Sequence, residues 1–298
     1  MWPAWTRTPI MVEAGPWWIG LLLPAILGAF ALGAAMLDAG SYPLKAAAGL
    51  LIQQRRKTLA ADILLLRAGI FALVAAAVLA AVVIPLGEVA VLDTGVGVVW
   101  FNMAEVLAWA AVWMVGWGAN SAYAMVGGYR FVAQGLAYEL PHMFALITAA
   151  LGAESLRVGD IVEAQRDLWF VVWMPAAFVV YLLSVLGMAF WGPFDQPAGR
   201  DIGGGARLEL SGVDRLLFEG GRWMLLTAGA AFAVPLFLGG GGWGWVIVKT
   251  AAALAALVWL KKRVPTVRLN RYVEFAWIVL IPVMLVQALV VAVVVLVR

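Results

Sequence analysis

Eight long apolar stretches alternate with short polar intervals along the 298-residue chain. An α-helix needs about 20 apolar residues to cross the hydrocarbon core of a bilayer. Most of these stretches approach that length, so we predict eight transmembrane helices. The fourth is short, with an earlier start near Gly135 as the alternative. The stretches cover residues 17–36, 68–86, 98–119, 140–153, 168–191, 223–238, 243–260 and 272–297.

A different pattern occupies residues 42–62, between the first two predicted spans. Apolar residues recur there at helical spacing and are followed by the basic cluster Arg55, Arg56 and Lys57. This pattern predicts an amphipathic helix that lies in the membrane interface. A plain cytoplasmic loop is the alternative. The apolar positions are Leu44, Ala48, Leu51 and Ile52.

Composition supports the same fold class. Hydrophobic residues make up 65% of the chain, charged residues make up 12%, and the mean hydropathy is +0.97. A soluble domain carries about 25% charged residues, so we predict an all-α integral membrane protein. The chain has no cysteine and one histidine, which excludes thiol chemistry, cysteine-ligated clusters and a multi-histidine metal site. No basic tract typical of nucleic-acid binding is present.

The distribution of Lys and Arg predicts the orientation. Fifteen of the 20 basic residues fall in the four odd-numbered connections, and four fall in the termini and the even-numbered connections. Basic loops favour the cytoplasmic side, so we expect both termini outside. The first apolar stretch lacks the features of a cleavable signal peptide and is expected to be retained. We find no internal repeat and expect residues 1–298 to form a single transmembrane domain.

The longest polar interval, residues 191–222, separates the fifth and sixth predicted spans. It contains nine of the chain's 37 charged residues and three consecutive glycines, Gly203 to Gly205, which disfavour a regular helix. No Lys-Ser or Lys-Thr pair follows them, so a phosphate-binding loop is excluded. A long polar loop between apolar spans is where chemistry or the docking of a partner is expected.

Several ionisable residues fall within or next to the predicted spans. Such groups are costly in a bilayer, so each is a candidate functional residue. Glu105, Glu139, Glu219 and Lys249 would form a buried polar track that exchanges protons, whereas structural ion pairs are the alternative. Glu274 is expected to pair with Arg271 or to reach the interface. For the single histidine, His142, we favour packing or hydrogen bonding between helices.

A series of motifs resembles a known family, the membrane-embedded H subunit (also numbered 1) of respiratory complex I, the NADH:quinone oxidoreductase. The same family includes a membrane subunit of energy-converting hydrogenases. The likeness runs in register from about residue 43 to the C-terminus. It is carried by GWGANSAY (116–123), GGYR (127–130), YELP (138–141), DIVEAQ (160–165), PFD (193–195) followed by ELSG (209–212), and LFLGG (236–240).

The resemblance implies a core subunit that forms the membrane side of a quinone chamber and links a peripheral redox arm to a proton-pumping membrane arm. Quinone would be a shared substrate, and iron–sulfur clusters and FMN would reside in partner subunits. The implied partners are peripheral quinone-site and iron–sulfur subunits, small membrane subunits and antiporter-like subunits, in a bacterial or archaeal cytoplasmic membrane. With Glu105, the candidate proton-path and chamber residues are Arg130, Glu139, Asp195, Glu209, Glu219 and Lys249; Arg130 is expected to pair with one of these acids.

The sequence also departs from the family pattern. A Glu and an Arg of the family's polar loop are replaced by Met188 and Trp191, and two acids of its acidic cluster by Ala198 and Arg200. These changes favour an alternative in which the chain anchors an energy-converting hydrogenase-type complex without quinone chemistry. A stand-alone transporter would require inverted repeats and broken helices, and we find neither in the sequence.

Overall fold

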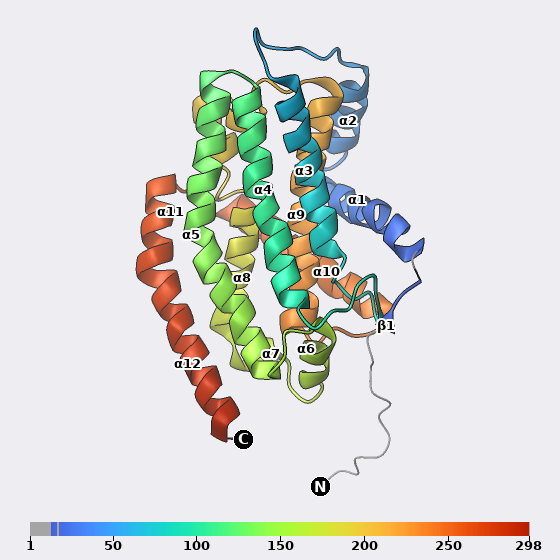
Figure 1. Cartoon of the computed structure of the whole chain (residues 1–298), viewed down its shortest axis with the longest axis vertical. Helices are drawn as coiled ribbons and strands as arrows, with labels where there is room; N and C mark the ends of the chain where they lie inside the picture. The colour runs from blue at the N-terminus through green and yellow to red at the C-terminus, as the bar shows by residue number, and fades with distance from the viewer. Residues whose placement is uncertain (1–12, 17, 298) are drawn as a thin grey trace.

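The computed structural model describes residues 13–16 and 18–297 as a bundle of long helices (Figure 1). Two short strands, β1 (Glu13–Ala14) and β2 (Val89–Ala90), pair in parallel at one end. The long loop after α8 forms three short 3₁₀ turns, η1 (Gln196–Ala198), η2 (Arg200–Ile202) and η3 (Gly205–Arg207). The α-helices are α1 (Trp18–Ala39), α2 (Tyr42–Ile52), α3 (Ile63–Ala81), α4 (Gly97–Gly118), α5 (Ala122–Ala153), α6 (Val158–Ala164), α7 (Phe170–Trp173), α8 (Pro175–Met188), α9 (Gly212–Phe237), α10 (Trp243–Arg263), α11 (Leu269–Phe275) and α12 (Ile281–Val297), the last two joined by a π-helical turn, η4 (Ala276–Leu280).

Each predicted apolar stretch coincides with a helical segment. Six helical segments of the described chain are long and apolar enough to cross a membrane, namely α1, α3, α4, α5, α10 and the continuous segment 269–297. The stretch 168–191 instead forms the short helices α7 and α8, and 223–238 forms the apolar part of α9. The protein is therefore a mostly helical, multi-pass membrane protein, whereas the count of eight spans remains a prediction.

The fourth predicted span is wrong at its start. We expected it near residue 140 or 135, but α5 begins at Ala122 and contains Arg130 and the preceding glycine pair. Tight packing explains the difference. A Cβ atom added at Gly127 would lie 2.2 Å from the backbone nitrogen of Ala206, so only glycine allows the loop to contact this helix. Packing against the loop thus overrides the low helix propensity of glycine.

The amphipathic helix is shorter than predicted. It ends at Ile52, and the basic cluster at residues 55–57 lies in an irregular segment. None of the side chains of α2 is fully buried, and Leu51 and Ile52 are 61% and 87% exposed. These exposed apolar side chains at the edge of the bundle fit a helix lying in the interface.

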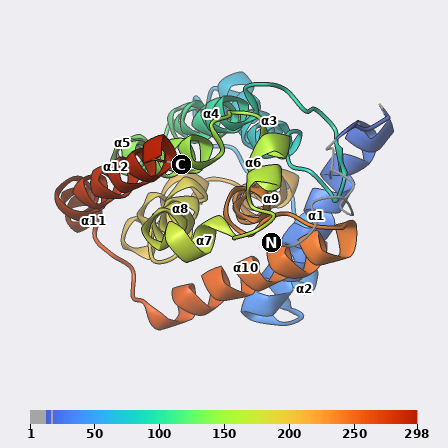
Figure 2. The same ribbon diagram turned by 90° about the horizontal axis from the view of Figure 1, so that it is seen from below.

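Helix α9 occupies the centre of the bundle, surrounded by α1, α3, α8 and α10 (Figure 2). Its apolar half contributes a run of buried residues from Leu225 to Phe237. Phe232 of α9 stacks on Phe101 of α4, with ring centroids 4.0 Å apart. The polar first turns of α9 are therefore anchored by a fixed apolar half and can hold charged side chains in place.

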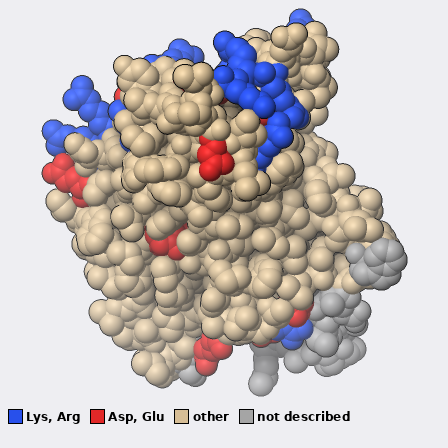
Figure 3. Space-filling view, turned by 45° about the horizontal axis from the view of Figure 1, so that its top comes forward, with Lys and Arg blue, Asp and Glu red and all other residues tan. Residues whose placement is uncertain are grey.

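The α4–α5 turn and the segment between α2 and α3 lie at the upper end of the bundle in Figure 1, whereas α6, the strand pair and the end of α12 lie at the lower end. Figure 3 shows most of the Lys and Arg side chains of the visible face near the upper end. Trp17 and the two chain ends lie outside the described residues, so the expectation that the termini are outside remains a prediction.

Close contact between α3 and α4 provides a test of this packing. A Cβ atom at Gly69 of α3 would lie 2.5 Å from the carbonyl oxygen of Ala111. We predict that Gly69→Ala separates the two helices and lowers the free energy of unfolding by about 1–3 kcal/mol. The loss should appear as a lower midpoint in thermal unfolding of the purified complex. Gly33→Ala is the matched control because its Cβ would meet nothing within 4 Å. Equal midpoints for the two variants would contradict the prediction.

Candidate functional site

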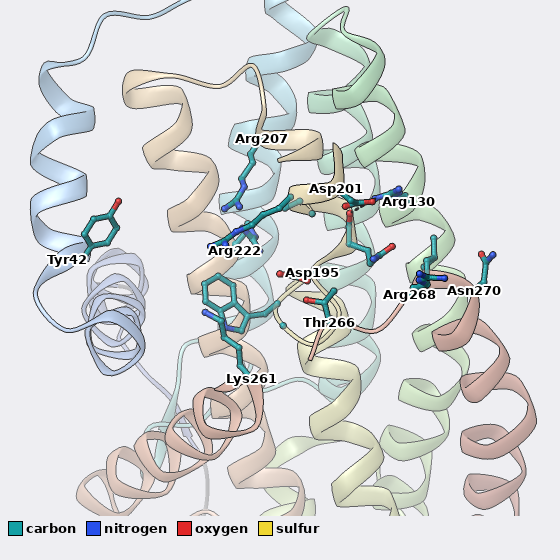
Figure 4. A pocket seen from close by; sticks show the side chains of 17 residues that line it. Tyr42, Arg130, Asp195, Asp201, Arg207, Arg222, Lys261, Thr266, Arg268 and Asn270 are labelled. Carbon is teal, nitrogen blue, oxygen red and sulfur yellow. Dashed lines mark hydrogen bonds and ion pairs between the residues drawn. The ribbon is translucent and has the colours of Figure 1, made fainter. Parts of the chain in front are cut away.

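A large cavity, here called the polar cavity, lies where the loop after α8 meets α5, α9 and the start of α11 (Figure 4). Its volume is about 1060 Å³. In Figure 4, Asp195 lies near the centre of the view, between Arg222 and Thr266. The lining residues are Tyr42, Arg130, Trp191, Gly192, Asp195, Gln196, Ala198, Gly199, Arg200, Asp201, Arg207, Arg222, Lys261, Thr266, Arg268, Leu269 and Asn270.

Two guanidinium groups hold Glu219 beside this cavity. Arg207 Nη1 lies 3.0 Å from Glu219 Oε1, and Arg222 Nη1 lies 2.9 Å from Glu219 Oε2. Arg222 is only 2% exposed and also donates to the carbonyl oxygen of Phe190 at 2.6 Å. Because Arg222 and Glu219 are three residues apart on α9, their side chains share one face of the helix. The carboxylate is therefore paired twice and fixes the loop to the helix.

Arg130 fixes a second point of the loop. Its guanidinium lies 2.7 Å from Asp201 Oδ2 and donates to the carbonyl oxygen of Gln196 at 3.3 Å. Asp201 is outside the set of acids that we expected to pair with Arg130. Asp195, in contrast, has a buried Oδ1 atom without a hydrogen-bond partner among the described residues. Asp195 is thus an acid of the cavity wall with one carboxylate oxygen left unpaired, whereas Asp201 is paired with Arg130.

Trp191 replaces an arginine of the family pattern at the edge of the polar cavity. The Lys261 ammonium lies 4.2 Å from the centroid of its ring and also pairs with Asp38 of α1. The Arg222 guanidinium lies 5.0 Å from the same ring, and Trp223 packs against it with centroids 4.1 Å apart. Position 191 therefore carries no positive charge itself, but two cationic side chains, Lys261 and Arg222, lie beside its ring.

A second cavity, here called the apolar recess, lies between α1, α2 and α9. It has a volume of about 800 Å³ and shares Tyr42, Trp191 and Arg207 with the polar cavity. Its walls consist mainly of Ala, Leu and Gly residues of α1 and α2, with Glu219, Trp223 and Met224 of α9 on the opposite side. An apolar space among the membrane helices thus adjoins a charged cavity at Trp191.

Glu105 and Glu139 come together deeper in the bundle. Glu105 is fully buried and accepts a hydrogen bond from the Tyr138 hydroxyl at 3.4 Å. Glu139 accepts one from Asn102 at 2.9 Å, and the two carboxyl groups interact with each other. This acid pair joins α4 to α5 within the membrane-spanning part of both helices. The pair consists of two acids and is not an ion pair, whereas a proton-exchanging track remains a prediction.

His142 lies beside the acid pair, one turn beyond Tyr138 on α5. Its ring stacks on Tyr181, with centroids 5.1 Å apart, and its Nε2 atom lies 4.0 Å from Glu105. The stacking agrees with the packing role that we favoured. Neither ring nitrogen has a hydrogen-bond partner in the described part of the chain.

Lys249 is not brought to this site. Its ammonium donates to the carbonyl oxygens of Leu238 and Gly240, at 2.6 and 2.7 Å, and lies 4.2 Å from the ring centroid of Trp169. These contacts satisfy carbonyl groups at the C-terminal end of α9, at the opposite end of that helix from Glu219. Among the described residues, Lys249 also forms no ion pair with an acid on a neighbouring helix, which was the expected alternative.

The remaining candidate acids, Glu209 and Glu274, lie outside both cavities. Glu209 is half-buried between η3 and α9 and lines neither cavity. Glu274 pairs with Arg271 at 3.3 Å, as expected. Arg222 was missed as a site residue, although its spacing from Glu219 is a signal that could have indicated it. Within residues 13–16 and 18–297 no cluster of three His, Asp or Glu side chains suits a metal ion.

A solved structure shares this fold. The chain superimposes on a chain of the membrane-bound sulfane sulfur reductase, an archaeal respiratory membrane complex, with a TM-score of 0.82. The superposition covers 91% of this chain and 98% of that one at 20% sequence identity, and so it establishes the fold alone.

The family follows from sequence comparison. The NADH dehydrogenase family model matches residues 42–292. The NADH-quinone oxidoreductase H subunit of Geobacillus kaustophilus is 35% identical over 68% of this chain, and the H 2 subunit of Cereibacter sphaeroides is 37% identical over 67%. The matches span 64% and 65% of the lengths of these relatives. This chain therefore belongs to the NADH dehydrogenase family of membrane subunits, together with the H subunits of NADH-quinone oxidoreductase.

The buried ion pairs of α9 lead to a stability prediction. Arg222→Met leaves Glu219 with Arg207 alone and removes the donor to the Phe190 carbonyl. We expect the free energy of unfolding to fall by about 1.5–3 kcal/mol, because Glu219 loses one of its two partners and the Phe190 carbonyl loses its charged donor. Thermal unfolding of the complex measures this effect. Arg271→Met, which breaks an exposed pair, should cost no more than about 1 kcal/mol. A similar small loss for both variants would show that Arg222 is not a structural anchor.

Proposed function

We propose that this chain is the core membrane subunit of a proton-translocating NADH:quinone oxidoreductase. In this role it forms the membrane side of the quinone chamber and links the peripheral redox arm to the proton-pumping arm. Family membership supports the assignment. The strongest structural support is that the apolar recess and the polar cavity meet at Trp191. A quinone has an apolar tail and a polar head, so the two adjoining cavities suit its two parts.

The two cavities divide the binding of quinone between them. The tail lies in the apolar recess between α1, α2 and α9, which opens among helices of the membrane-spanning bundle. The head enters the polar cavity, where Arg207, Arg222 and Lys261 surround Trp191. Positive charge beside the head stabilises negative charge that develops on its oxygens during reduction.

Electrons come from partner subunits in this proposal. The chain has no cysteine and one histidine, so iron–sulfur clusters and FMN would be held by the peripheral arm. The charged loop after α8 and the start of α11 offer the surface where those subunits dock. The remaining membrane partners, small subunits and antiporter-like subunits, would contact the exposed apolar helices in a bacterial or archaeal cytoplasmic membrane. In this proposal the chain forms a single domain with eight membrane spans. Both termini lie on the side of the membrane opposite the cytoplasm.

The chain's own acids carry the coupling in this proposal. Asp195 takes up or releases a proton at the cavity, and the Glu105–Glu139 pair holds the next proton within the membrane. Because a buried pair of carboxyl groups strongly disfavours two negative charges, its proton occupancy responds to charge in the cavity. Glu219 remains paired with its two arginines and senses that charge electrostatically.

An anchor subunit without quinone chemistry is the second candidate. The replacement of two family acids by Ala198 and Arg200 favours it, since both residues line the polar cavity and make it more basic. Purification of the intact complex in mild detergent, followed by subunit identification, distinguishes the two. A nickel–iron subunit with hydrogen production and no quinone reduction would replace the first candidate by the second.

The acid pair gives a direct test of the coupling role. Glu139→Gln keeps the size and the hydrogen bond of the side chain but removes the exchangeable proton. We predict that inhibitor-sensitive quinone reduction coupled to proton movement falls by at least about 100-fold. The measurement uses the purified complex in liposomes with a pH-sensitive dye. Glu274→Gln is the control because Glu274 is exposed at the surface; activity in the Glu139 variant equal to that control would contradict the role.

The apolar recess gives a separate test of substrate binding. Ala47 lines the recess, whereas the adjacent Ala48 does not line it and is exposed. We predict that Ala47→Trp fills the recess and raises the KM for a long-tailed quinone about tenfold, since each 1.4 kcal/mol of lost binding costs that factor. A tail-less quinone should be unaffected. If Ala48→Trp gives the same increase, the recess is not the site of the tail.

A further inference from the structure

Tyr272 has a buried hydroxyl that the packing of the bundle does not explain. Its side chain is 2% exposed, and its hydroxyl is the one tyrosine oxygen in the described chain that is buried without a hydrogen-bond partner. An unpaired hydroxyl in an apolar interior is destabilising. Phenylalanine would fill the same space without that cost, so the hydroxyl itself requires a reason.

On one side, Tyr272 lies next to residues of the polar cavity wall without lining the cavity itself. The nearby residues Leu269 and Asn270 of α11 line that cavity. The Tyr272 ring stacks on Phe194, with centroids 4.0 Å apart and an angle of 29° between the planes. Phe194 directly precedes Asp195, whose unpaired Oδ1 atom lies in the cavity wall. The stack of Phe194 and Tyr272 therefore lies beside the cavity-wall residue Asp195, although neither ring lines the cavity.

On the other side, Tyr272 meets the surroundings of the acid pair. A Cβ atom placed at Gly187 of α8 would lie 3.0 Å from the Tyr272 hydroxyl oxygen and 3.1 Å from Cδ1 of Tyr138. Both tyrosines thus converge on a position that has no side chain. Tyr138 donates its hydroxyl to Glu105, and Glu105 Oε1 has no hydrogen-bond partner among the described residues.

We propose that Tyr272 passes protons between the polar cavity and the Glu105–Glu139 pair. This inference deepens the proposed function and depends on it. In each step the phenol oxygen accepts a proton from the cavity side while its own O–H proton leaves toward the acid pair. No net charge remains on Tyr272 and no electron moves. Rotation of the new O–H bond restores the starting arrangement.

The test compares Tyr272→Phe with the wild-type complex in liposomes. The variant keeps the ring stack on Phe194, and co-purification of all subunits establishes assembly. We expect proton-coupled quinone reduction to fall at least about tenfold, because a positioned proton donor is lost. We also expect the solvent deuterium isotope effect on the residual rate to increase, because proton transfer becomes rate-limiting. A purely structural residue would not change that isotope effect.

Tyr181→Phe is the matched control. Tyr181 is also fully buried and stacks on His142 beside Glu105, but its hydroxyl is already paired because it donates to the carbonyl oxygen of Gly229. Its variant should retain the rate within about twofold. A Tyr272 variant with an unchanged rate, or with a lower rate and an unchanged isotope effect, would overturn the inference. A wild-type complex that neither reduces quinone nor moves protons would overturn the proposed function as well.

Discussion

The buried ion pairs around Glu219 are the interaction on which the rest of the site depends. Arg222 is almost completely removed from solvent, and it pairs with Glu219 on its own helix while donating to the Phe190 carbonyl at the start of the polar loop. A charge in this position is tolerated only when it is fully paired. The network therefore fixes the loop to α9, and the loop in turn places Trp191 and Asp195. Trp191 lines both cavities, so the shape of each depends on how the ion pairs of Glu219 hold the loop.

The apolar stretches could be located from the sequence because a helix in a bilayer must satisfy its own backbone hydrogen bonds and present apolar side chains to lipid. Their ends were harder to locate. The start of α5 was placed too late because Gly127 and Gly128 disfavour a helix locally, and the contact that compensates comes from residues 197–206, about 70 positions later. Helix α2 was predicted too long for a different reason, because its last apolar position is Ile52, where the helix ends, and the basic residues beyond it were included in the predicted helix.

The candidate site could also be predicted only in part from the sequence. Glu105, Glu139, Asp195 and Glu219 could be selected because charges in apolar surroundings are rare and costly. The sequence could not show which of these side chains lie together, because that depends on which helices are neighbours. Lys249 satisfied the same sequence criterion, yet it lies at the opposite end of α9 and satisfies backbone carbonyls. Tyr272 and Trp191 carry no charge and gave no signal of this kind, although the proposed function and the proposed proton route depend on them.

Under the role proposed for Tyr272, one chain keeps a polar cavity and an acid pair apart and still couples them. The acid pair is held between α4 and α5 by Asn102, Tyr138 and the packing of the two helices, whereas the cavity is open to charged groups of the loop. Direct contact between them would let ions and water reach the centre of the bundle. In this proposal the stack of Phe194 and Tyr272 prevents that contact, and the Tyr272 hydroxyl leaves a route that only a proton can use. Gly187 is central to this arrangement, because any larger residue would occupy the place where Tyr138 and Tyr272 meet.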